Sequence, residues 1–120
     1  MGPKKKDVAV AEDEAAERGT TPAEVLREKG LLPLVVVRTF GAGVHVGLCA
    51  RREGMEVDLV DGRRLWRWRG ANSLHEVALH GVDDWSRLSE PTSYTLTTAI
   101  EVLPVSDRAR ESLTRSRWPA

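Results

Sequence analysis

The chain has 120 residues with 18 basic and 18 acidic side chains, so its formal net charge at pH 7 is zero. This length predicts one domain, and the balanced charge gives no reason to expect a long polyanion as partner. A single cysteine excludes an intrachain disulfide and favours a reducing, cytoplasmic setting, and no apolar run approaches the roughly 18 residues that a membrane-spanning helix needs.

The first residues differ in composition from the middle of the chain. Three lysines at positions 4–6 precede an acidic, alanine-rich run from Val8 to Arg18 that holds no aromatic residue. We expect residues 1–20 to form a flexible N-terminal extension, residues 21–116 a single β-rich domain and residues 117–120 a tail. A domain of this size buries a modest share of its surface, so we also expect copies of the chain to associate.

Capping signals predict short helices. Segments 21–24 and 73–76 each begin with a hydroxyl side chain and end with glutamate three residues later, the pattern of a capping box. Gly30 and Gly81 follow at positions typical of a helix C-terminus. A serine at position 106 predicts a final short helix through residue 113.

Alternating and β-branched apolar runs predict strands between these helices. The runs occur at residues 34–40, 44–50, 55–59, 64–68 and 94–102. Glu53-Gly54 predicts a tight reversal, and Asp61-Gly62 is a strong hairpin signal. The predicted fold is therefore α+β and mainly antiparallel β: a compact meander sheet or a small barrel with two or three short helices.

The segment 63–69 concentrates arginine and tryptophan, with four arginines in seven residues. Indole faces provide a stacking surface for a nucleobase, and guanidinium groups bind phosphate. The candidate ligand-binding residues are Arg63, Arg64, Trp66, Arg67, Trp68, Arg69 and Asn72. In the alternative interpretation, Trp66 and Trp68 fill the core and the arginines pair with Glu56, Asp58 or Asp61. The sequence leaves open which face of this strand is buried.

Other motifs do not indicate chemistry. The glycines at 41, 43 and 47 lead into a strand, whereas a phosphate-binding loop must lead into a helix. His45, His75 and His80 lack the spacing of a metal site, and no serine sits in a nucleophile elbow. We therefore expect no enzyme activity, no catalytic residue, no metal and no cofactor, with Cys49 as a small packing residue.

Three segments carry a family resemblance: residues 36–47 (VVRTFGAGVHVG), 63–74 (RRLWRWRGANSL) and 99–105 (AIEVLPV). They resemble small phage- and prophage-encoded proteins over roughly residues 34–115, and the group that is similar includes the Thoeris anti-defence sponges. This resemblance implies a non-enzymatic homo-oligomer that sequesters an immune signal of the cyclic ADP-ribose type. The expected partner is a small anionic nucleotide, with no membrane and no nucleic acid.

Two other functions also fit the sequence. A structural or accessory virion protein would pack the β domain in an array and use the N-terminal extension to tie subunits together. A nucleic-acid-binding module would use residues 63–69 to contact phosphates, with salt-dependent affinity.

Overall fold

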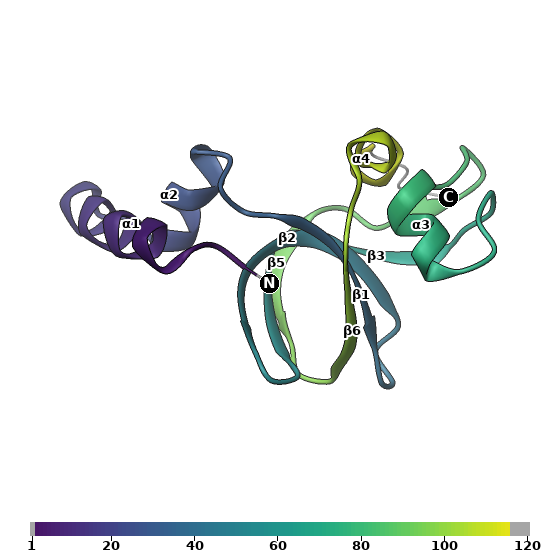
Figure 1. Ribbon diagram of the computed structural model, residues 1–120, viewed down its shortest axis with the longest axis horizontal. Coiled ribbons are helices and arrows are strands. Elements are labelled where there is room, and N and C mark those ends of the chain that lie inside the picture. Colours follow the sequence, from purple (N-terminus) through teal and green to yellow (C-terminus); the bar gives the residue numbers. More distant parts are fainter. Residues whose placement is uncertain (1, 116–120) are drawn as a thin grey trace.

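The computed structural model describes residues 2–115, so residue 116 of the expected domain and the expected tail at 117–120 lie outside the described residues. The elements in chain order are α1 (Lys5–Arg18), α2 (Pro22–Glu28), β1 (Leu34–Thr39), β2 (Val44–Glu53), β3 (Glu56–Arg67), α3 (Leu74–His80), β4 (Arg87–Leu88), β5 (Thr92–Leu96), β6 (Ala99–Pro104) and α4 (Asp107–Thr114). This arrangement confirms the mainly antiparallel α+β class, with one helix more than predicted (Figure 1). Within residues 2–115, no helix has the length and apolar character needed to cross a membrane.

The six strands form one open sheet in the order β4-β3-β2-β1-β6, and β5 pairs with β3. Strands β1, β2 and β3 are the predicted meander. The sequence predicts one strand over 94–102, but the structure has two, because the chain turns at Thr97-Thr98. Hydrogen bonds between Thr98 and the backbone of Phe40 stabilise the turn. The turn connects β5, which pairs with β3, to β6, which pairs with β1.

Strand β3 continues through Asp61-Gly62, where the sequence predicts a hairpin, so that prediction is wrong. Asp61 has a φ of 52°, and the pairing of β3 with β2 changes register at this point. The left-handed conformation that makes Asp-Gly a good turn also suits a β-bulge, which inserts one extra residue into a strand. Leu59 and Leu65 show the result: six residues apart, they would face the same way on a regular strand, yet they belong to different cores.

Apolar side chains pack on both faces of the sheet. One face is covered by the two helix pairs that Figure 1 shows at opposite ends of the molecule. Helices α3 and α4 cover Leu34, Val36, Val46 and Leu65, and helices α1 and α2 cover Leu48, Ala50 and Val60. The other face packs Val35, Val37, Cys49, Val57 and Leu59 against Leu96 and Ala99. Strand β1 is therefore buried on both faces, as its three valines predict.

The predicted helix caps form. The side chains of Thr21, Ser73 and Ser106 each accept a hydrogen bond from the backbone N–H three residues later. Helix α1 occupies residues where the sequence predicts a flexible extension. Ala11 and Ala15 are buried against Val25 and Leu26 of α2, because alanine has a high helix propensity and lets two helices approach closely.

Gly47 and Gly62 lie face to face across β2 and β3, and a Cβ atom added to Gly47 would lie 2.8 Å from the Cα atom of Gly62. Gly47→Ala is therefore expected to lower the free energy of unfolding by roughly 1–3 kcal/mol, because the backbone must shift. Urea denaturation measures the change. Gly54→Ala is the control: that site has open space and a φ of 57°, so it reports backbone strain alone. A loss below about 1 kcal/mol in Gly47→Ala would contradict the contact.

The imidazole of His45 is buried between β2 and β5. Its Nδ1 atom lies 2.7 Å from the Tyr94 hydroxyl and its Nε2 atom 2.8 Å from the carbonyl oxygen of Ala42. A neutral imidazole satisfies both partners, because Nε2–H donates to the carbonyl and Nδ1 accepts from the hydroxyl. Burial lowers the pKa of His45 and raises the pKa of Tyr94 to about 12.

Acidification is expected to weaken the fold through His45. The unfolded imidazole takes up a proton below about pH 6.5, whereas its lowered pKa keeps the native imidazole neutral, so stability falls as the pH falls through this range. Urea midpoints at about pH 7.5 and about pH 5.5 measure the effect. His45→Gln removes the titrating group, and the same pH dependence in that variant would refute the assignment.

Candidate functional site

The structure divides the predicted ligand-binding residues between two places. Arg63 lies on the face of the sheet that α4 covers, where it lines a cavity. Trp66, Arg67, Trp68 and Arg69 lie at the end of β3 and just beyond it, beside β4. The bulge at Asp61-Gly62 and the alternation of the strand that follows produce this division.

The cavity has a volume of about 280 Å³ and lies between the sheet and α4. Its lining combines aliphatic side chains with two arginines, one aspartate and one threonine. It consists of Leu34, Val46, Leu48, Asp61, Arg63, Pro91, Arg110, Leu113 and Thr114. Strand β3 supplies Arg63 and helix α4 supplies Arg110. A largely apolar hollow with a few convergent polar groups is typical of small-molecule sites.

Arg63 is only 9% exposed, and its Nη1 atom donates a hydrogen bond to the carbonyl oxygen of Arg115 at 2.8 Å. Within residues 2–115, no ion pair includes this guanidinium; Asp61, two residues earlier, pairs with Arg27 at 3.1 Å. Burial lowers the pKa of Arg63, yet an arginine stays protonated in a protein. The cavity therefore contains a desolvated positive charge that no described carboxylate neutralises by direct pairing.

Two side chains of α4 complete the polar part of the cavity. Arg110 is exposed at its edge, and Thr114, one turn further, donates its hydroxyl proton to the carbonyl oxygen of Arg110 at 2.7 Å. Arg110 also borders a second hollow, whose lining includes Lys4 and the turn at residues 30–33. Asp7 and Asp107 line the same hollow, so charges of both signs lie at the opening between α4 and the N-terminal residues.

The second group of residues lies around the end of β3 and strand β4, and we call it the tryptophan-arginine surface. It consists of Arg64, Trp66, Arg67, Trp68, Arg69, Trp85 and Arg87. The Arg67 guanidinium carbon is 4.3 Å from the ring centroid of Trp85 and 5.5 Å from that of Trp66. Arg69 lies 5.2 Å from the ring of Trp85 and pairs with Asp83 at 2.8 Å. These stacks are cation–π contacts that hold the arginines in place.

The interpretation that Trp66 and Trp68 fill the core is wrong. Their side chains are 39% and 37% exposed. The acids proposed to pair with the arginines of 63–69 have other partners: Glu56 and Asp58 pair with Arg51 across the β2–β3 hairpin, and Asp61 pairs with Arg27.

The structure also shows where sequence reasoning missed residues. Trp85 belongs to the tryptophan-arginine surface and Arg110 lines the cavity. A tryptophan within the polar loop 83–91 was a signal for Trp85, whereas no sequence pattern pointed to Arg110. The predicted Asn72 instead lies just before α3, next to the N-cap residue Ser73, and its backbone N–H donates to the Glu76 carboxylate at 3.1 Å. Within the described part of the chain, no group of three or more His, Cys, Asp or Glu side chains is placed to hold a metal ion.

Comparison with known proteins gives one relationship. A search of curated proteins and a search of solved structures each found no significant match. A family model described as a domain of unknown function (DUF6948) matches residues 32–113. The matched range contains the whole sheet, helix α3, both arginines of the cavity and the tryptophan-arginine surface, whereas α1 and α2 precede it. Because the match covers more than half of the chain, the protein belongs to the DUF6948 family.

Proposed function

We propose that this protein is a non-enzymatic binding protein that sequesters a small anionic nucleotide, an immune signal of the cyclic ADP-ribose type, as a phage- or prophage-derived anti-defence sponge. The observation that carries the binding proposal is the buried guanidinium of Arg63 in the cavity under α4. The role as a sponge comes from the resemblance in sequence. Sequestration requires affinity without turnover, so the proposal needs no catalytic group.

The electrostatics of the cavity support an anionic ligand. Removing a guanidinium from water costs several kcal/mol, and a carboxylate or phosphate that binds it in the same cavity recovers part of that cost. Arginine can donate two parallel hydrogen bonds to one phosphate group. Arg63 would hold the anion from the floor of the cavity, and Arg110 would approach it from the edge.

The shape of the cavity supports partial enclosure of a nucleotide. Its volume of about 280 Å³ is near the lower limit of small-molecule pockets, which begin at roughly 300 Å³. A phosphate group with part of its sugar fits this space against the aliphatic wall. The rest of a nucleotide would extend through the opening toward Arg110 and the hollow beside Lys4.

Calorimetric titration with cyclic ADP-ribose isomers and cyclic dinucleotides tests the proposal, with inorganic phosphate as the minimal anion. Arg110→Ala is expected to weaken binding by roughly tenfold to a hundredfold, because a hydrogen bond to a charged group contributes about 1.5–3 kcal/mol. Arg108→Ala is the matched control, since Arg108 is also exposed on α4 but does not line the cavity. Affinity weaker than micromolar for every nucleotide, or equal losses in the two variants, would reject the proposal.

Arg63→Met separates binding from stability. The apolar side chain of similar length removes the cost of burying a charge and loses one hydrogen bond, worth about 1 kcal/mol, to the Arg115 carbonyl. We expect the free energy of unfolding to stay the same or rise, while nucleotide binding disappears. Urea denaturation measures the first quantity and calorimetry the second.

Arg51→Met is the control for that variant, because Arg51 pairs with Glu53, Glu56 and Asp58 and its loss is expected to reduce stability modestly. A loss of more than about 3 kcal/mol in Arg63→Met would show that the buried arginine is compensated within the fold, as expected when one partner of a buried pair is removed.

A further inference from the structure

We propose that the tryptophan-arginine surface is a self-association site, which binds the acidic side of helix α1 from a second copy of this chain. The acidic side of α1 is defined by three exposed residues, Glu12, Asp13 and Glu17. This contact uses residues outside the cavity under α4, so it stands independently of the proposed nucleotide site.

The indoles of the tryptophan-arginine surface leave a large apolar area in contact with solvent. Trp66, Trp68 and Trp85 are each between 37% and 41% exposed. Tryptophan and arginine are the residues most enriched at the energetic centres of protein interfaces. Arg67 is already held between two indoles. Binding of a partner would therefore cost little additional side-chain entropy at this residue.

The charge of this surface favours an acidic partner. Within residues 2–115, no ion pair includes Arg64, Arg67 or Arg87, whereas Arg69 is paired with Asp83. Arg67 and Arg87 are opposite each other in the β3–β4 ladder, and like charges in that position repel. Their terminal nitrogens donate to backbone carbonyl oxygens of residues 84–86, which fixes both guanidinium groups without neutralising their charge. Carboxylates at this edge would relieve the repulsion.

Helix α1 carries the complementary charge. It has five acidic and three basic residues, and the acidic side has no ion pair within the described part of the chain. Val10 on the same helix is 56% exposed, which provides an apolar side chain for contact with the indoles. Since α1 lies outside the family-matched residues 32–113, it is an element that this chain adds to the DUF6948 domain.

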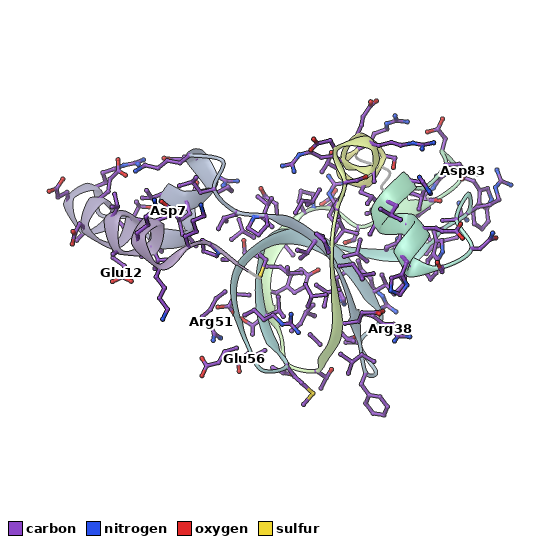
Figure 2. The ribbon with its side chains drawn as sticks, viewed as in Figure 1. Asp7, Glu12, Arg38, Arg51, Glu56 and Asp83 are labelled. Carbon is purple, nitrogen blue, oxygen red and sulfur yellow. The ribbon has the colours of Figure 1, made fainter. Side chains whose placement is uncertain are left out.

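The two surfaces cannot meet within one molecule. The protein is 44 Å long along its longest axis. Figure 2 shows Glu12 at one end and Asp83, the partner of Arg69, at the other. The contact must therefore join different surfaces of two copies, an arrangement that produces a closed ring or an open chain of subunits.

Sedimentation velocity over a concentration series tests this contact. The full chain is expected to form larger species as its concentration rises in low salt, and to dissociate when added salt screens the charges. Charge reversal of α1 with Glu12→Lys, Asp13→Lys and Glu17→Lys is expected to weaken association on the order of tenfold or more. Arg108→Glu, which reverses an exposed charge on α4, should associate like the parent chain.

A second variant, Arg64→Glu with Arg67→Glu, reverses the charge of the tryptophan-arginine surface. Each charge-reversed variant alone is expected to stay monomeric, because its two surfaces then carry charge of the same sign. An equimolar mixture of the two variants should associate, because the basic α1 of one can bind the acidic surface of the other. Circular dichroism confirms folding, and if the second variant does not fold, the α1 variant alone still decides the outcome.

Three results would overturn the inference. The parent chain could remain monomeric at every concentration in low salt. It could associate equally well after charge reversal of α1, which would assign the contact to another surface. Finally, a monomeric chain could bind a single-stranded oligonucleotide, with binding lost when Arg64 and Arg67 are reversed, which would make this surface a nucleic-acid site.

Discussion

The bulge at Asp61-Gly62 determines which face of the sheet the side chains of β3 occupy as far as Leu65, including the candidate ligand-binding residues Arg63 and Arg64. Before it, the odd-numbered residues face the core that contains Leu59; after it, Leu65 and the side chains in phase with it face the helices. A regular strand would direct Arg63 into the apolar core around Leu59, where an unpaired charge costs several kcal/mol. The bulge instead places this arginine beside α4 and leaves the nearby tryptophans on the surface.

Close packing of glycines permits this bulge. Gly47 of β2 lies directly against Gly62, and an added Cβ on Gly62 would lie 2.8 Å from the ring of Tyr94. The same ring hydroxyl bonds to His45, so the bulge, the aromatic ring and the buried imidazole form one packed unit. The position of the cavity therefore depends on small residues that do not line it.

The sequence predicted the local features well. Helix caps and the doubly buried β1 follow from short patterns that the tertiary structure preserves. The sequence-based prediction was wrong where one pattern fits two structures. Asp-Gly suits a turn and a bulge equally. The alternation over 94–102 likewise does not mark the turn at Thr97-Thr98. For the candidate site, the segment 63–69 supplies Arg63 of the cavity and most of the tryptophan-arginine surface. Its division between these two regions and the contributions of Trp85 and Arg110 depend on contacts distant in sequence.

The order of the strands in the sheet leaves one edge of β1 unpaired during part of the synthesis of the chain. Strands β1, β2 and β3 are neighbours in sequence, so they can pair as soon as they leave the ribosome. The outer edge of β1 pairs with β6, where Val36 is opposite Leu103, and that partner is made only after the rest of the sheet. During this interval an apolar strand edge is open to pairing with other nascent chains. Slow translation between β3 and β6 would therefore favour aggregation, and a chaperone that covers β1 would favour the native sheet.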